Sequence, residues 1–246
     1  MSFYRRLLTI FGTDVAVGGG AAFSPLSLSP LGFWLSRPQY LRQSSDGTGA
    51  VTEDGDPVGW REDLSGNGHH LTQATDELRW VYHTDGTSHW IVPGAAGAFL
   101  ANADISIADG LDCFVALRQV SWSDITFIEK AIDPANGYMY QGNSTPNIVI
   151  TNTGGANTVT IAATVGVDVV HTSRRGTSAR AAIDNGDYVT GNTGAGTRTG
   201  LQIGFNSDGN AADVRDYGRM VSSTALADAD IVSVRAYLAA EQGRVL

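Results

Sequence analysis

The sequence predicts an all-β fold, an antiparallel β-sandwich over residues 31–246 with an extended N-terminal arm and one C-terminal helix. Two observations support this prediction. Charged residues make up 17% of the 246 residues and glycine occurs 30 times, a composition typical of β-rich proteins with many turns. Short apolar segments are also separated by turn residues about every 8–12 positions, as in a sandwich or barrel.

The charge and cysteine content exclude several classes of protein. The net charge is −9, so nucleic acid is not an expected partner, because phosphate binding needs a basic surface. An anionic membrane surface is disfavoured for the same reason. No run of about 18 apolar residues is present, so no membrane insertion is expected. Cys113 is the only cysteine, and an intrachain disulfide therefore cannot form.

Residues 1–30 are predicted to form an arm that anchors the chain, either on its own domain or on a neighbouring subunit of an assembly. The start of this arm mixes aromatic and basic side chains. The candidate anchor residues are Phe3, Tyr4, Arg5, Arg6 and Phe11. Further along, Pro25 and Pro30 favour extended chain over helix.

Beyond the arm, short alternating segments predict the strands of the sandwich. The later candidates are Asp112–Val120, Asp124–Ile132, Asn147–Thr151, Thr158–Val165, Val167–Thr172, Ala179–Ile183, Asp187–Thr190, Leu201–Phe205 and Val214–Val221. Between two of them, Asn185 and Gly186 supply the positive φ values of a type I′ turn and predict a hairpin.

One helix is predicted at the end of the chain, over Asp228–Glu241. Ile231, Val234 and Leu238 follow one another at i, i+3 and i+7 and form one apolar stripe. Gly243 is a suitable stop signal. A single helix after many strands suggests a lid on an open end or edge of the sandwich.

The sequence does not show a catalytic motif. Glycoside hydrolysis needs two carboxyl groups that flank the bond, and acidic residues at alternate positions of one strand would be the signal. Glu129 lies in a strand-like segment, but Ala131 and Asp133 do not complete such a pattern. A Gly-x-Ser-x-Gly motif is missing, and the five histidines lack metal-binding spacing. No catalytic residue is assigned and the chain is not expected to be an enzyme; a glycan-cleaving hydrolase is the remaining enzymatic alternative.

One cluster of aromatic and polar residues is a candidate for glycan binding. Apolar sugar faces stack on aromatic rings, and amide groups bind sugar hydroxyls. The candidate residues are Trp122, Tyr138, Tyr140 and Asn143. Aromatic residues of a sandwich also belong to its core, and that alternative stays open.

No cofactor is expected, and calcium is the alternative, because aspartates are frequent in the predicted turns and Ca²⁺ takes carboxylate and carbonyl ligands. The turn aspartates are Asp104, Asp109, Asp184, Asp187, Asp208 and Asp213. Aspartate also favours turns without any metal.

The segment 52–73 is the most specific motif in the chain. It reads Thr-Glu-Asp-Gly-Asp-Pro-Val-Gly-Trp-Arg-Glu-Asp-Leu-Ser-Gly-Asn-Gly-His-His-Leu-Thr-Gln. It resembles the opening of concanavalin A-like lectin/glucanase domains of the laminin G-like kind. Ala182–Gly186, Leu201–Gly204 and the helix after Leu226 are similar to later parts of that family. The resemblance covers residues 31–246 and implies a jelly-roll sandwich.

Two details of this resemblance matter for a site. The family usually carries Phe-Asp-Gly-x-x-Asp where this chain has Trp90–Gly97, which contains no acid. In physical terms Asp63–Gly68 is a tight-turn sequence, in which Asp63 and Asn67 can bond nearby backbone N–H groups and the glycines accept positive φ. We therefore expect this turn to determine the fold rather than to form a site.

The variant with Asp-Gly-Asp-Pro-Val-Gly resembles virion structural proteins of tailed phages and prophages. This resemblance implies a tail fibre or head spike, located in the virion, that displays a lectin-like domain to host-surface glycan. Other virion subunits, a homo-oligomer and host polysaccharide are the expected partners. The alternatives are a decoration or connector subunit without glycan affinity, and the hydrolase considered above.

Overall fold

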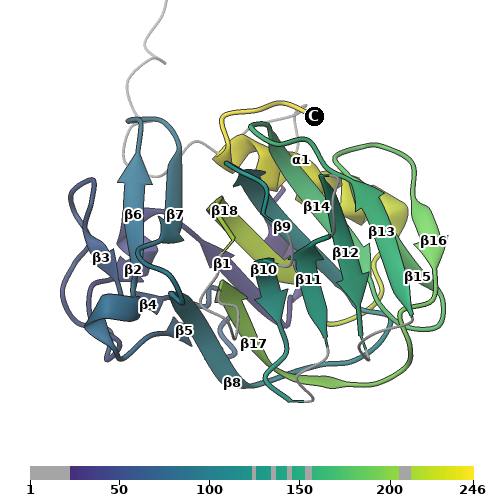
Figure 1. Ribbon diagram of the computed structural model, residues 1–246, viewed down its shortest axis with the longest axis horizontal. Helices are drawn as coiled ribbons and strands as arrows, with labels where there is room; N and C mark the ends of the chain where they lie inside the picture. Colours follow the sequence, from purple (N-terminus) through teal and green to yellow (C-terminus); the bar gives the residue numbers. More distant parts are fainter. Residues whose placement is uncertain (1–22, 124–125, 134–136, 143–145, 153–156, 205–211) are drawn as a thin grey trace, which may run out of the picture.

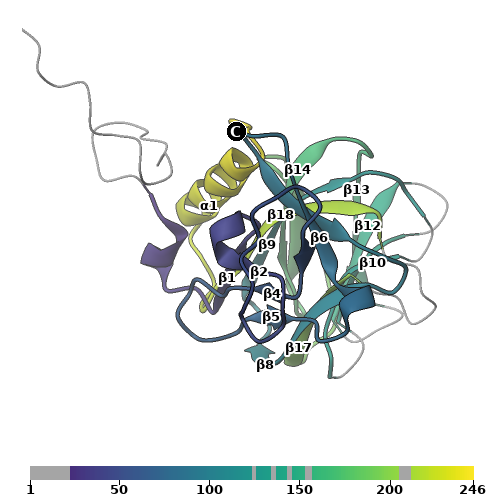
Figure 2. The same ribbon diagram turned by 90° about the vertical axis from the view of Figure 1, so that its left-hand side faces the viewer.

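Two antiparallel sheets packed face to face form the body of the protein. The computed structural model describes residues 23–123, 126–133, 137–142, 146–152, 157–204 and 212–246. Within them, each sheet has nine strands, and one α-helix lies on the outer side of one sheet (Figures 1 and 2). The predicted all-β sandwich with a C-terminal helix is confirmed.

Sheet A lies against the helix. Its strands, in spatial order, are β16 (Val189–Gly191), β15 (Ala179–Ile183), β14 (Asp168–Arg174), β9 (Asp112–Gln119), β18 (Val214–Val221), β7 (His89–Pro93), β6 (Trp80–Thr84) and β3 (Pro57–Val58). The remaining strand, β1 (Gly32–Leu35), pairs with β18.

Sheet B forms the opposite layer and is the nearer one in Figure 1. Its strands, in spatial order, are β13 (Thr158–Ala162), β12 (Asn147–Thr151), β11 (Tyr138–Gln141), β10 (Thr126–Lys130), β17 (Arg198–Gly204), β8 (Phe99–Ile107), β5 (Leu71–Thr72), β4 (Trp60–Arg61) and β2 (Leu41–Arg42).

The core between the sheets follows from the alternation of side chains along each strand. On β12, Ile148 and Ile150 are buried in the inter-sheet core, whereas Val149 points to the outer face. Charged residues also bridge the layers: Glu129 on β10 accepts a hydrogen bond from the Arg219 guanidinium on β18 at 2.8 Å. The sandwich is therefore held by apolar packing and by buried ion pairs.

The helix α1 occupies Asp228–Glu241, as the sequence predicts. Ile231, Val234 and Leu238 are buried against the outer face of sheet A, where they meet residues of β9, β14 and β18. The predicted position at an end or edge of the sandwich is wrong, because the outer face of sheet A carries its own apolar residues and needs a cover. Gly243, at φ 71°, follows the helix as predicted.

The turn Asp63–Gly68 confirms its expected structural role. The Asp63 carboxylate accepts hydrogen bonds from the backbone N–H groups of Ser65 at 3.0 Å, His69 at 2.9 Å and Phe33 on β1 at 3.0 Å. Gly66 and Gly68 both have positive φ. Asn67 differs from expectation, because its side-chain amide donates to the carbonyls of residues 30 and 31. The turn thus ties β1 into the sandwich.

Two local predictions need correction. The hairpin of β15 and β16 is present, but the positive φ falls on Asp184 rather than on Asn185 and Gly186, so a type I′ turn is not formed. The Asp184 carboxylate accepts from the Val170 N–H at 2.8 Å, which holds the chain in this other path.

The second correction concerns the end of the predicted arm. Pro25–Leu28 form a 3-10 helix, η1, instead of extended chain, because Pro25 occupies its first turn and Ser24 caps it. Phe23 and Leu28 pack against the cluster under α1. The candidate anchor residues Phe3, Tyr4, Arg5, Arg6 and Phe11 lie outside the described residues, and the arm remains a prediction. Two further 3-10 helices are η2 (Pro38–Tyr40) and η3 (Asp76–Leu78).

Candidate functional site

Three aromatic side chains gather on the outer face of sheet B and form what we call the aromatic row: Phe127, Tyr138 and Tyr140. The antiparallel register of β10 and β11 places Phe127 opposite Tyr140, and Lys130 opposite Tyr138. Because directly paired residues point to the same face, these side chains share the outer surface, while their neighbours Ile128 and Met139 enter the core.

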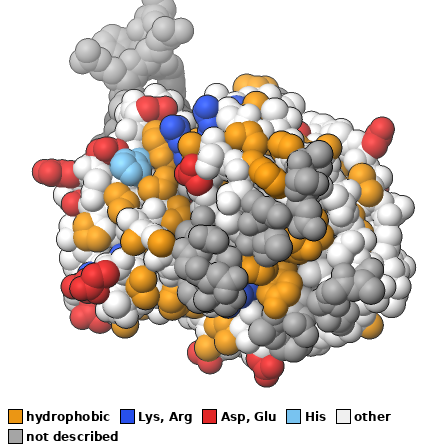
Figure 3. Space-filling model, viewed as in Figure 1, with side chains coloured by type: hydrophobic (Ala, Val, Ile, Leu, Met, Phe, Trp, Pro, Cys, Tyr) orange, Lys and Arg blue, Asp and Glu red, His pale blue; other side chains and the backbone are white. Residues whose placement is uncertain are grey.

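The rings of the aromatic row are close enough to act together. The Phe127 centroid lies 4.8 Å from that of Tyr138 and 5.8 Å from that of Tyr140, and the two tyrosine centroids are 6.5 Å apart. All three residues are half-buried, so each ring keeps an accessible part. Figure 3 shows hydrophobic side chains gathered over the strands of sheet B on this face. Such a surface suits the apolar face of a sugar ring.

The structure brings Tyr138 and Tyr140 together, as the sequence suggested, and adds Phe127, which sequence reasoning treated only as part of a strand. Trp122 lies nearby on the loop after β9. Gln141, the residue after Tyr140, accepts from the Ser123 N–H at 3.0 Å and donates to the Ser121 carbonyl at 3.0 Å. The glycan-binding role of Trp122 remains a prediction, and Asn143 lies outside the described residues.

The indole N–H of Trp122 is buried and has no hydrogen-bond partner among the described residues. Trp122 as a whole is only half-buried. Its indole N–H is thus unavailable to a ligand in this conformation, and any contact with sugar would use the ring.

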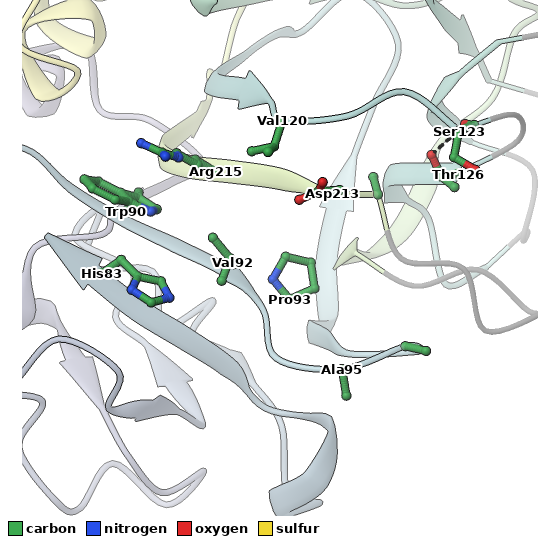
Figure 4. A pocket seen from close by; sticks show the side chains of 12 residues that line it. His83, Trp90, Val92, Pro93, Ala95, Val120, Ser123, Thr126, Asp213 and Arg215 are labelled. Atoms are coloured by element: carbon green, nitrogen blue, oxygen red, sulfur yellow. Dashed lines mark hydrogen bonds between the residues drawn. The ribbon is translucent and has the colours of Figure 1, made fainter. Parts of the chain in front are cut away.

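A hollow of about 570 Å³ lies between β7 and the ends of β9 and β18 (Figure 4). Thr126, the residue before Phe127 on β10, lines one end of it. Its walls are formed by His83, Trp90, Val92, Pro93, Ala95, Ala96, Val120, Ser123, Thr126, Ala212, Asp213 and Arg215. Its volume lies within the range of small-molecule sites. Trp90–Ala96 belong to the segment that lacks the acids of the resembling family.

Stacked side chains form one wall of the hollow. The Arg215 guanidinium lies over the Trp90 indole, 4.5 Å from the ring centroid. Trp90 is itself flanked by His83, with centroids 6.2 Å apart, and by Tyr217, with centroids 5.9 Å apart. His83 in turn lies 3.1 Å from the Asp54 carboxylate. Arg215 is therefore held in place by a preformed stack.

Asp213 is the carboxylate on the wall of the hollow, within the described residues. It is exposed and accepts a hydrogen bond from the Ser121 hydroxyl at 2.7 Å. Glu129 and Asp216 lie between the sheets instead, paired with arginines. Burial works to raise the pKa of Asp216, but Arg219 and Arg61 overcome it and hold that pKa below its ordinary value.

A metal centre is not evident in the described part of the chain, where no group of three or more His, Cys, Asp or Glu side chains is placed to hold an ion. Two of the turn aspartates make contacts within the protein. The Asp109 carboxylate accepts a hydrogen bond from the Gly196 N–H at 2.7 Å, and Asp184 forms an ion pair with Arg244 at 2.6 Å. Asp208 lies outside the described residues, and calcium remains a prediction. No helix in the described residues is long and apolar enough to cross a membrane.

Comparisons with known proteins identify the fold. No family model and no curated protein matches the sequence. A GH54 α-L-arabinofuranosidase structure matches with a TM-score of 0.62 and 15% identity, over 89% of this chain and 65% of its own. Domain 4 of a GH43 extracellular arabinanase from Geobacillus stearothermophilus, in complex with arabinotriose, matches with a TM-score of 0.54 and 11% identity, over 70% of this chain and 91% of the domain.

A Trypanosoma rangeli sialidase in complex with sialic acid also matches, with a TM-score of 0.54 and 11% identity, over 85% of this chain and 33% of the sialidase. The chain thus spans less than two thirds of the arabinofuranosidase and of the sialidase. At these identities the likeness shows the fold alone. It nevertheless overturns our expectation that the chain is not an enzyme, because that expectation rested on missing sequence motifs and glycosidases share this fold.

Proposed function

We propose that this chain is a carbohydrate-recognising β-sandwich domain that binds glycan across the aromatic row of sheet B. The single observation that carries the proposal is the grouping of Phe127, Tyr138 and Tyr140 within 4.8–6.5 Å on one outer face. The separate hollow lined by Trp90 and Arg215 offers the depth and polar groups that sugar sites use for orientation. The neighbour crystallised with arabinotriose supports the same class of ligand.

The test is binding of the full chain to a panel of polysaccharides that includes arabinan, arabinoxylan and bacterial surface polysaccharide. We expect saturable binding to at least one polymer, weakened in Tyr140→Ala. Trp60→Ala is the matched control. Consecutive cross-strand pairs run from Trp60 through β5, β8, β17 and β10 to Tyr138, so both side chains point to the same outer face. Trp60 lies at the far end of sheet B, away from the aromatic row. Equal losses in both variants would contradict the proposal. Repeating the assay with EDTA tests the calcium alternative.

Glycan cleavage is a second candidate function, supported by arabinofuranosidase and sialidase structures among the neighbours. In the described residues, the hollow offers Asp213 as a carboxylate. If the chain cleaves glycan there, incubation with arabinan should release reducing sugar, and Asp213→Asn should abolish the release without abolishing binding. Asp104→Asn, at an exposed site on β8, is the control.

We further propose, on the resemblance of residues 52–73, that the domain is displayed on a phage or phage-like particle to bind host-surface glycan. This part of the proposal has no support from the structural neighbours. Immunogold labelling of particles with an antibody against the chain tests it directly. Labelled fibres or spikes would support the proposal; particles that contain no copy of the chain by mass spectrometry would refute it.

A further inference from the structure

We infer that the hollow selects glycans that carry a carboxylate on one sugar residue, and that Arg215 is the residue that recognises this carboxylate. The inference rests on the proposed carbohydrate recognition and specifies its ligand class. Its basis is the position and pairing of Arg215, which the function proposed for the aromatic row does not use.

Arg215 differs from most arginines of this protein in its pairing. Arg174 and Arg244 each contact a carboxylate at 2.6 Å, and Arg37 contacts one at 2.7 Å. Within the described residues, Arg215 has no carboxylate in ion-pair distance. Figure 4 shows its guanidinium extended over Trp90 and directed away from Asp213. The guanidinium is half-buried and contacts the Tyr217 hydroxyl, but it pairs with no carboxylate among the described residues, which suits it to an anionic ligand group.

The stack on Trp90 prepares this guanidinium for a carboxylate. The Arg215 guanidinium carbon lies over the Trp90 ring, 4.5 Å from its centroid, and the N–H donors that do not bond Tyr217 can bind the oxygens of a carboxylate. The Trp90 ring is fixed by its contacts with His83 and Tyr217. Because Arg215 stacks on this fixed ring, its side chain loses little further conformational entropy when a ligand binds. The geometry therefore favours recognition of a single, oriented carboxylate.

The rest of the hollow is complementary to a sugar ring. Val92, Pro93 and Ala95 provide an apolar surface that can accept the C–H face of a pyranose. Asp213, at the same wall, is an acceptor for sugar hydroxyls. These groups define a ligand with an apolar face, hydroxyls and one negative charge, which is the chemistry of a uronic or sialic acid residue.

The overall charge limits how many carboxylates the ligand carries. The chain has a net charge of −9, and Asp213 adds negative charge inside the hollow. The negative charge of the protein repels a polyanion strongly. A glycan with a single carboxylate is repelled only weakly, and its carboxylate gains the contact with Arg215. We therefore assign the hollow to isolated acidic sugars and not to polyuronates.

The test compares matched glycans by calorimetric titration of the full chain. The probes are 3′-sialyllactose with lactose, glucuronyl-xylotriose with its methyl ester, and trigalacturonate as the polyanion. We expect at least one singly charged glycan to bind at least about tenfold more tightly than its neutral counterpart, and more tightly than trigalacturonate. Arg215→Gln should remove that difference.

Arg42→Gln is the matched control, since Arg42 also has no ion pair among the described residues but lies on β2, and its guanidinium donates to backbone carbonyls. Thermal unfolding of each variant verifies that it is folded. Equal affinity for charged and neutral glycans, or an unchanged preference in Arg215→Gln, would overturn the inference while leaving the proposed function intact. Absence of binding to any glycan, charged or neutral, would refute both.

Discussion

At the scale of single residues, His171 links pH to the stability of the sandwich. Its side chain is buried on β14, and neither ring nitrogen has a hydrogen-bond partner among the described residues. Burial lowers its pKa to about 4, although the charge of Asp184 acts in the opposite direction. The folded protein therefore holds His171 neutral over a pH range in which an exposed histidine is protonated.

This burial predicts an acid-dependent loss of stability. Between pH 6.5 and about 4 the unfolded chain takes up a proton at His171 and the folded chain does not. The stabilisation is complete above pH 6.5 and is lost as the pH falls, by about 3 kcal/mol at pH 4. His171→Leu should remove this part of the pH dependence. Urea unfolding at pH 7, 5 and 4 measures it; parallel curves for the two proteins would contradict the role of His171.

Asp63 is predicted to matter for folding and not for a ligand, since its carboxylate accepts the backbone N–H groups of Phe33, Ser65 and His69. Asp63→Ala leaves these donors unsatisfied and should lower the free energy of unfolding by about 3 kcal/mol. Asp104→Ala, at an exposed carboxylate, should change it by less than about 0.5 kcal/mol. Equal, small effects in chemical denaturation would show that the turn is dispensable.

At the scale of elements, the outer face of sheet A depends on its cover by α1. Leu238 is fully buried in the cluster between them, and its truncation in Leu238→Ala should cost about 2–4 kcal/mol. Val232 is 49% exposed on the same helix, so Val232→Ala is the matched control and should stay within about 0.5 kcal/mol of wild type. A loss for Val232→Ala as large as that for Leu238→Ala would mean that the helix face is assigned incorrectly.

The elements also show which features a sequence can predict. α1, β12, β15 and β18 have the bounds that their periodicity and turn residues indicate. The strand β8 was not predicted, because its middle contains Asn102 and Asp104, residue types that strands avoid. In the structure the Asn102 side chain accepts from the N–H groups of Asp104 and Ile105, where the pairing with β17 shifts in register. Local bonds of this kind cannot be read from alternation.

The candidate site is less predictable than the fold because it is assembled from distant segments. Tyr138 and Tyr140 occupy alternate positions of one strand, and the sequence indicated them as part of a local cluster of aromatic and polar residues. Trp90 and Arg215 are 125 positions apart in the sequence and meet only through the packing of β7 and β18. Composition alone does not indicate such a pair, and residues 90–97 carry no acid that would mark them as the lining of a hollow.

At the scale of the whole molecule, buried ion pairs connect the two sheets. The Glu129 carboxylate lies 2.8 Å from Arg175, 2.8 Å from Arg219 and 3.8 Å from Arg198. Glu129→Ala would leave these buried guanidinium groups without their carboxylate and should cost about 3–5 kcal/mol. Glu77→Ala, at an exposed residue, is the control. If thermal and urea unfolding of both variants match wild type, the ion pairs do not hold the sheets together.

The central claim is that the aromatic row of sheet B binds glycan, and one titration tests it most directly. The oligosaccharide of the polymer that binds best is titrated into the wild-type chain, into the Tyr138→Ala/Tyr140→Ala double variant and into Trp60→Ala. Loss of ring stacking should weaken binding by about tenfold or more in the double variant, and Trp60→Ala should bind as wild type does. A folded double variant with wild-type affinity would contradict the account.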